Sequence, residues 1–265
     1  LGDVYKRQLV THDPKEGGLG FTFKWNMGWM HDFLEYMKLD PYFRKYNHNR
    51  MTFSLTYFTS ENYILVLSHD EVVHLKCSMI NKMPGLGEDK FSNLKAGYTF
   101  MLGHPGKKLL FMGQDFGQWH EWDEKVSLDW YLAEEESHKK LQEYVRDLLH
   151  IYKKYPCLYQ LDNDWNGFQW INANDGDRSI FSFIRKDETG KKNLLFVVNF
   201  TPVDRPDYRV GVPKRCKLSL LLDNVHGAYK PSQCPTYTSV KSECDGQPYS
   251  ISYPLGGYGT AIFRF

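Results

Sequence analysis

Two acids and two histidines lie within six positions in the segment LSHDEVVH, residues 67–74. The segment overlaps the end of the apolar run YILVL, residues 63–67, which is typical of a strand buried on both faces. Adjacent acids at the end of a buried strand can have strongly shifted pKa values, and such groups act in acid–base chemistry or stabilise charged transition states. The spacing therefore makes Asp70 and Glu71 candidates for catalysis.

Two other interpretations of this segment stay open. In the first, Asp70 caps a turn after the strand and Glu71 faces solvent, so that neither does chemistry. In the second, His69, Asp70 and His74 bind a metal ion. Two histidines five positions apart with a carboxylate between them match no common zinc signature, and we therefore predict no metal site.

Three strand–helix units precede residue 155. The patterns of residues 21–24, 63–67 and 109–112 predict strands, and apolar residues at helical spacing predict helices over 29–40, 90–103 and 134–154. Such units predict a parallel sheet covered by helices.

Polar or aromatic residues follow the carboxyl end of each predicted strand: Trp25 and Asn26, residues 68–71, and residues 113–115. Ligand sites on parallel sheets and barrels gather at such ends. A TIM-type barrel needs eight units in about 250 residues, so three units would form only part of one.

From about residue 161 the pattern changes to short strands. We expect strands at 168–172, 179–185, 194–200, 208–212, 217–222 and 258–265, and a loop over 231–248. These predict an antiparallel β-sandwich of about 100 residues. Because a sandwich closes its own core, we expect this part to fold more independently than the units before it.

Composition excludes several classes of partner. The chain has 33 Lys and Arg against 32 Asp and Glu, so no electrostatic attraction to nucleic acid or to an anionic membrane is expected. Its longest apolar run, residues 194–200, is far shorter than the roughly 20 residues that cross a bilayer. Five cysteines without C-x-x-C spacing and no apolar stretch of signal-peptide length near residue 1 predict a cytoplasmic location.

Aromatic residues make up 16% of the chain, and exposed rings can stack on sugars. Trp25 follows a predicted strand, which favours binding, whereas Trp29 lies on the apolar stripe of a predicted helix and is expected in the core. The sequence does not decide between these roles for Trp119 and Trp122.

Three longer motifs stand in the order found in one family: GGLGFTFKWNMGWMHD at 17–32, LSHDEVVH at 67–74 and PGKKLLFMG at 105–113. With SLDW at 127–130 and NFTPV at 199–203, the chain resembles the bacterial 1,4-α-glucan (glycogen) branching enzymes of the α-amylase superfamily. The likeness covers residues 9–265. SHDE alone would indicate only the superfamily.

The resemblance implies an α/β fold in which residues 9–158 form about the last three β/α units of a TIM-type (β/α)8 barrel and residues 159–265 form an all-β sandwich domain. It implies two kinds of site residue: catalytic Asp70 and His69, and substrate-binding Trp25, Asn26, Glu71, His74 and Asp115. The substrate would be an α-glucan such as glycogen or amylose. No cofactor is implied, and a monomer is expected.

In this family a nucleophilic Asp attacks the anomeric carbon, a Glu protonates the leaving oxygen, and a third acid, matched here by Asp70, stabilises the transition state. A glucan 6-hydroxyl then captures the segment and forms an α-1,6 branch. The motifs that carry the nucleophile and the acid belong before Gly17, and they are not found. We therefore expect this chain alone to be inactive.

Several positions depart from the family pattern. Leu75 and Cys77 stand where the family has glycine, so the loop after Asp70 would have shifted if those glycines had positive φ. Asp115 stands in place of Glu, which shortens its reach by one methylene. Residues 1–8 do not fit the family and are expected to be a non-native leader.

Two competing hypotheses remain. One is another α-amylase-superfamily hydrolase, although KWNMGWMHD at 24–32 fits such enzymes poorly. The other is a non-catalytic carbohydrate-binding fragment. DxxRxD-type and EES-type motifs in the gene upstream of Leu9 would favour the branching enzyme.

Overall fold

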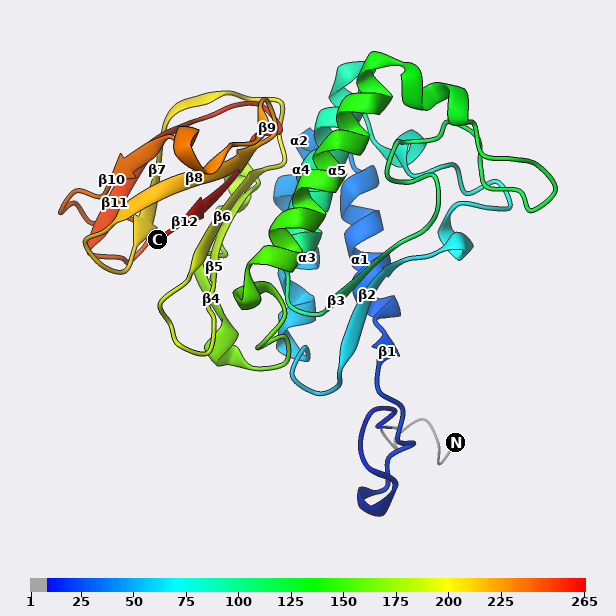
Figure 1. The fold of residues 1–265 in the computed structure, drawn as a ribbon, viewed down its shortest axis with the longest axis horizontal. Helices are drawn as coiled ribbons and strands as arrows, with labels where there is room; N and C mark the ends of the chain where they lie inside the picture. Colours follow the sequence, from blue (N-terminus) through cyan, green and yellow to red (C-terminus); the bar gives the residue numbers. More distant parts are fainter. Residues whose placement is uncertain (1–8) are drawn as a thin grey trace.

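The computed structural model describes residues 9–265, and its first part is a parallel sheet covered by helices (Figure 1). Strands β1 (Lys24–Trp25), β2 (Tyr63–Leu67) and β3 (Lys107–Leu110) lie in that order, all parallel. The long helices are α1 (Met27–Lys38), α4 (Glu88–Gly103) and α5 (Glu136–Lys154), and the short helices α2 (Pro41–Arg44) and α3 (Asn49–Phe53) follow α1. The predicted parallel sheet is confirmed. The predicted leader, residues 1–8, lies outside the described residues.

Two strands of this sheet have other boundaries than predicted. Only Lys24 and Trp25 pair with β2, so Trp25 belongs to β1 instead of following it, and residues 21–23 lie outside the strand. Strand β3 runs from Lys107 to Leu110, two residues earlier than predicted, because these residues pair with Ile64–Leu67 of β2. The Lys107 ammonium donates to the Tyr159 carbonyl at 2.9 Å and to the Asp162 carboxylate at 2.8 Å.

Helix α1 begins and ends as its sequence dictates. The Asn26 side chain accepts a hydrogen bond of 2.9 Å from the Trp29 N–H and so caps the first turn. The helix buries an apolar face that includes Trp29 and Phe33, and Pro41 two residues beyond its cap at Leu39 prevents continuation. This capping fixes where the chain leaves β1.

The second part is a β-sandwich. Its large antiparallel sheet has the order β10-β8-β12-β6-β5-β4, with β9 beside β8, and its small sheet pairs β11 with β7. The strands are β4 (Phe168–Asn172), β5 (Ile180–Arg185), β6 (Leu194–Asn199), β7 (Arg205–Val212), β8 (Lys217–Asp223), β9 (Gly227–Ala228), β10 (Thr236–Thr238), β11 (Tyr249–Leu255) and β12 (Thr260–Arg264). The predicted all-β part is confirmed.

The predicted loop over 231–248 is wrong in part, because it contains β10, and β11 was not predicted at all. Strand β11 carries Pro254 where its register with β7 shifts between Tyr253 and Leu255. Proline is tolerated in a strand at such an irregularity. Because proline otherwise argues against a strand, the sequence did not predict β11. The last strand starts at Thr260 instead of 258, after Tyr258 with a φ of 48°.

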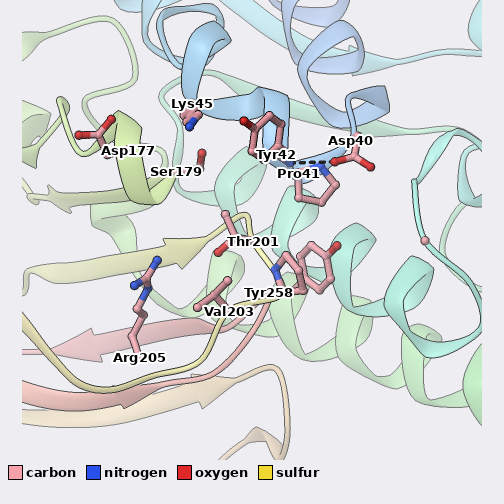
Figure 2. A pocket seen from close by; sticks show the side chains of 12 residues that line it. Asp40, Pro41, Tyr42, Lys45, Asp177, Ser179, Thr201, Val203, Arg205 and Tyr258 are labelled. Carbon is pink, nitrogen blue, oxygen red and sulfur yellow. Dashed lines mark hydrogen bonds between the residues drawn. The ribbon is translucent and has the colours of Figure 1, made fainter.

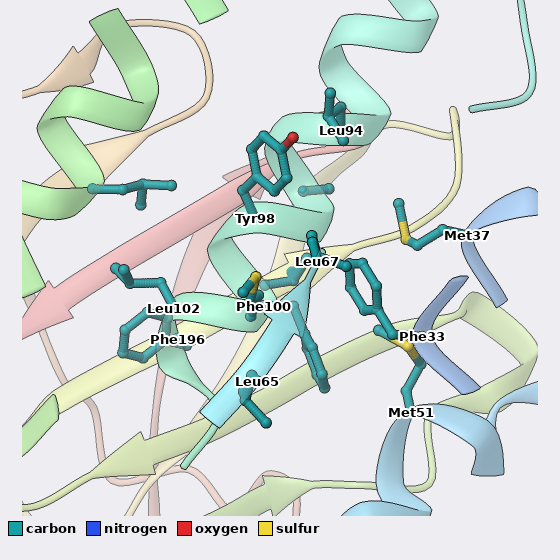
Figure 3. Close-up of a cluster of buried hydrophobic side chains, with 14 of the residues drawn as sticks. Phe33, Met37, Met51, Leu65, Leu67, Leu94, Tyr98, Phe100, Leu102 and Phe196 are labelled. Carbon is teal, nitrogen blue, oxygen red and sulfur yellow. The ribbon is translucent and has the colours of Figure 1, made fainter. Parts of the chain in front are cut away.

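The large sheet is buried on both faces. Along β5, Ile180 and Ile184 face the small sheet, whereas Phe181 and Phe183 join a cluster that also holds residues of α1 and α4. Figure 3 shows Phe196 of the sandwich beside Leu102 of α4. Burial on both faces explains why the strand at 194–198 is a continuous apolar run.

The sandwich therefore does not close all of its own core, because its face against α4 shares a cluster with the helices. The expectation that it folds more independently than the units before it stays a prediction. Contact with α4 is close: a Cβ added at Gly103 would come within 2.7 Å of the Phe183 ring and 2.8 Å of the Phe196 ring. The buried Arg185 guanidinium adds hydrogen bonds to the Gly103 carbonyl at 2.9 Å and to the Asp162 carboxylate at 2.9 Å. Both apolar and charged contacts thus join the two parts.

His104, which follows α4, is a buried neutral group in this shared region. Its Nδ1 lies 2.8 Å from the Pro105 carbonyl, which can only accept, so Nδ1 donates and Nε2 accepts from the Ser54 hydroxyl at 2.7 Å. Burial lowers the pKa of His104 from 6.5 to about 3.

Folding should therefore weaken in acid. Between pH 6.5 and about 3 the unfolded chain binds a proton at His104 that the folded chain does not, so the free energy of unfolding should fall as the pH falls, by a few kcal/mol at most. Urea unfolding at several pH values checks this. His104→Gln should reduce the slope, whereas His150→Gln, at an exposed site, should leave it unchanged; equal slopes in all three proteins would contradict the assignment.

Among residues 9–265, no helix is both long and apolar enough to cross a membrane.

Candidate functional site

The carboxyl ends of three neighbouring parallel strands meet at one edge of the sheet. Asn26 follows β1, residues 68–71 follow β2, and residues 111–113 follow β3. Figure 1 shows the loops after β2 and β3 on the same side of the sheet. This edge is where parallel folds place their ligands.

Asp70 presents a free carboxylate at this edge. Its side chain is 47% exposed, and the His69 Nε2 atom lies 3.2 Å from its Oδ1 atom. The Ser68 hydroxyl donates to Oδ2 at 3.2 Å. Among the described residues, no backbone N–H donates to this carboxylate, so Asp70 does not act as a turn cap and the first of the open interpretations is wrong for it.

Glu71 points into the protein instead of into solvent. It is 8% exposed, its Oε1 atom lies 3.4 Å from the Lys76 Nζ atom, and the His31 Nε2 atom lies 4.0 Å from the same oxygen. The interpretation of Glu71 as a solvated residue is therefore wrong. Its carboxylate holds the loop that follows.

That loop contains three left-handed residues. His74, Leu75 and Cys77 have φ values of 56°, 68° and 67°, a conformation in which a side chain crowds its own backbone. Leu75 and Cys77 therefore adopt the conformation that glycine adopts easily, which costs other residues backbone strain. The expectation that the loop is shifted relative to the family stays a prediction.

Glycine at either position should therefore stabilise the chain. Leu75→Gly and Cys77→Gly are each expected to raise the free energy of unfolding by about 1 kcal/mol, because they remove the crowding of a left-handed residue. Leu86→Gly, at an exposed residue of ordinary φ, should lower it. Urea unfolding compares the three, and a loss of stability in both loop variants would contradict the strain argument.

The four tryptophans considered from the sequence lie in different environments. Trp25 is 43% exposed, whereas Trp29 is buried, which confirms its expected core role. Trp119 packs edge-on against His138 and Phe91. The Trp122 ring lies 6.3 Å from the His69 ring, so of the two undecided tryptophans only Trp122 contacts a predicted catalytic residue.

The other predicted binding residues have mixed positions. Asn26 is buried, and its Oδ1 atom accepts from the Trp29 N–H and from the Tyr57 hydroxyl at 3.0 Å. His74 is exposed in the loop after Asp70. Asp115 lies in the turn after β3, where its carboxylate accepts from Gln142 of α5 at 3.0 Å. No described hydrogen bond joins it to the residues around Asp70.

Sequence reasoning missed the residues that hold the loop after Asp70. The Lys76 ammonium donates to the Asp70 carbonyl at 2.8 Å, and the buried Lys82 ammonium donates to the Lys76 carbonyl. Burial lowers the pKa of Lys82. The Glu121 carboxylate accepts from two N–H groups of the loop. Lys76, six positions after Asp70, is the one local signal that could have indicated such a role.

The edge can bind polar groups and stabilise positive charge, since it offers a free carboxylate, an imidazole and an indole together. Among the described residues, no three His, Cys, Asp or Glu side chains come close enough to hold a metal ion. The carboxylate of Asp70 beside His69 can supply electrostatic stabilisation of positive charge.

A cavity of about 440 Å³ lies elsewhere, between α2 and the edge of the sandwich, and Tyr42, Thr201 and Arg205 line it (Figure 2). Its lining contains none of the predicted site residues. Asp40 at its rim is used to cap α2, where it accepts from the Tyr42 N–H at 2.9 Å. We therefore place the candidate site at the sheet edge.

Known proteins are similar to this chain in sequence. The family described as "Alpha amylase, C-terminal all-beta domain" matches residues 170–265. The 1,4-alpha-glucan branching enzymes GlgB of Butyrivibrio fibrisolvens, Halothermothrix orenii and Gloeobacter violaceus are 57%, 53% and 47% identical to it over 97% of its length. The chain spans 40%, 41% and 35% of those relatives.

Solved structures agree on the fold. The pullulanase type I of Bacillus subtilis, complexed with maltose, matches 91% of this chain and 35% of its own with a TM-score of 0.65 at 13% identity. The alpha-amylase of H. orenii matches 92% of this chain and 49% of its own with a TM-score of 0.58 at 15% identity. The predicted fold class and the resemblance to branching enzymes are both confirmed.

Proposed function

We propose that this chain, a relative of the bacterial 1,4-alpha-glucan branching enzymes, is the carboxyl-terminal part of such an enzyme. It would supply three β/α units of the barrel, residues 9–158, and the all-β domain, residues 159–265. The observation that carries the proposal is Asp70, a half-exposed carboxylate at the carboxyl end of β2 with His69 at 3.2 Å. The two catalytic acids that the family also uses would come from the rest of the enzyme.

In the proposed reaction, one carboxylate attacks the anomeric carbon while an acid protonates the leaving glucan, so the α-1,4 bond breaks and a glycosyl ester forms. A glucan 6-hydroxyl then attacks the anomeric carbon of this ester and loses its proton to the former acid. The bond to the carboxylate breaks, which frees that carboxylate and leaves the α-1,6 link. Asp70 stabilises the positive charge that develops on the ring in both steps. His69, beside it, binds a sugar hydroxyl.

The predicted binding residues fall into direct and indirect roles in this proposal. Trp25 offers an exposed indole for stacking on an α-glucan, and His74 extends the polar edge. Asn26 and Glu71 are both buried. They would act indirectly, Asn26 by capping α1 and Glu71 by holding the loop after Asp70. Asp115 would act only through the packing of α5, because its carboxylate is bound to Gln142.

We further propose a monomer in the cytoplasm with α-glucan as its partner. The five cysteines are all free thiols, which fits a reducing compartment. Sedimentation of the whole enzyme would test the monomer, and cell fractionation the location.

A chimera tests the function directly. Residues 9–265 would replace the matching part of the Butyrivibrio fibrisolvens enzyme, and proton NMR would count new α-1,6 linkages on amylose. Branch formation near the rate of the unmodified relative is expected. New reducing ends without branches would favour a hydrolase, and neither product would favour a non-catalytic carbohydrate-binding role.

A further inference from the structure

The loop after Asp70 is fastened to a distant segment of the chain. The Glu121 carboxylate accepts from the Leu75 N–H with Oε2 at 2.9 Å and from the Cys77 N–H with Oε1 at 2.6 Å. Both oxygens are thus used on one loop, and these contacts join residues 46 and 44 positions apart. The next residue adds another bond, since the Trp122 N–H donates to the Val72 carbonyl at 2.9 Å.

The two N–H groups that Glu121 binds belong to strained residues. Leu75 and Cys77 are both left-handed, with φ values of 68° and 67°. In that conformation a non-glycine residue is unfavourable, and it persists only where surrounding contacts impose it. Hydrogen bonds to a charged acceptor are stronger than those between neutral groups, so the two that Glu121 accepts can hold the loop.

The fastened loop in turn contacts Asp70. Lys76 stands between the two residues that Glu121 binds, and its ammonium donates to the Asp70 carbonyl at 2.8 Å and to the Glu71 carboxylate at 3.4 Å. A change of path at Leu75 and Cys77 would therefore withdraw Lys76 from the short 3₁₀ turn, His69–Glu71, that carries Asp70.

We propose that Glu121 is a positioning residue for Asp70, acting through the backbone of Leu75 and Cys77 and the side chain of Lys76. The proposal rests on the proposed function for its catalytic consequence. Its structural half, the fastening of the loop, stands without it. Glu121 itself touches no reacting atom in this scheme, so its loss should affect catalysis more than binding of glucan.

The fastening can be measured in the 265-residue chain without any activity. Glu121→Ala should speed hydrogen exchange of the Leu75 and Cys77 amides at least about tenfold, because a lost charge-assisted bond of 1.5–3 kcal/mol corresponds to that factor or more. Glu121→Gln, which keeps one acceptor oxygen, should have a smaller effect. The matched control is Glu124→Ala, at an exposed residue of the segment that carries Glu121. Exchange rates equal to those of this control would overturn the proposal.

The catalytic consequence is measured in the chimera. Glu121→Ala should lower kcat for branching at least about tenfold with less than a threefold change in KM, and Glu121→Gln should recover part of the loss. Combining Glu121→Ala with glycine at both Leu75 and Cys77 should also recover activity, because glycine adopts the left-handed conformation without help. Equal losses with and without the glycines, or a change in KM alone, would overturn the positioning role.

The two measurements separate two failures. A chimera that makes no branches even with Glu121 present would count against the proposed function, whereas the exchange experiment would still support or overturn the fastening of the loop.

Discussion

Asp70→Asn in the branching chimera is expected to lower the rate of α-1,6 bond formation at least about a hundredfold. Asparagine keeps the size of the side chain and its place beside His69, but it removes the negative charge that stabilises the oxocarbenium-like transition state. Because the Asp70 carboxylate is half exposed and its described side-chain contacts are few, the substitution should hardly change stability.

The rate is followed by the decrease of iodine staining on amylose, with α-1,6 linkages counted by proton NMR. Asp123→Asn, whose carboxylate only accepts from the Lys125 N–H in a surface loop, is the matched control and should behave like the unsubstituted chimera. A rate above about a tenth of that chimera for Asp70→Asn would show that Asp70 is not the stabilising acid.

The 265-residue chain by itself is expected to form no branches at all. A retaining mechanism needs two carboxylates about 5–5.5 Å apart across the scissile bond, and the acid adjacent to Asp70 in sequence, Glu71, is buried against Lys76. Within residues 9–265, β1 and β3 are the outer strands of a three-stranded sheet, so a glucan would meet only part of a cleft.

Purified chain would be incubated with amylose, and new α-1,6 linkages would be counted beside the Asp70→Asn form of the same chain. Linkages above this reference would contradict the argument from the missing acids. Retention of amylose on the chain without product would support binding through the exposed Trp25 ring.

Parts of the fold that follow from local pattern could be predicted. The run YILVL indicated β2 and so the position of Asp70, and helical spacing with a following proline placed α1. The run at 194–198 is equally continuous, which already indicates cover on both faces, yet the shared core was not predicted. Strand β11 was missed although Tyr249, Ile251, Tyr253 and Leu255 alternate with Ser250, Ser252 and Pro254, because proline usually argues against a strand.

The residues that support Asp70 could not be predicted in the same way. Glu121 reaches the loop by accepting from backbone N–H groups of Leu75 and Cys77, and any residue type offers such a group. A contact of this kind leaves no periodicity and no paired residue types in the sequence. From the sequence, a positive φ at these two positions was considered only for the glycines that the family has there. Nothing in the local sequence required leucine and cysteine to adopt it.

The close packing of α4 against the sandwich also limits how such proteins can be recombined. The Gly103 backbone packs against the stacked rings of Phe183 and Phe196, and Arg185 donates to the Gly103 carbonyl. A hybrid gene joined near residue 160 would combine an α4 from one parent with a β5–β6 surface from another, and side chains of unmatched size would meet there. Exchange of segments between distant relatives should therefore succeed when α4 and the sandwich both come from the same parent.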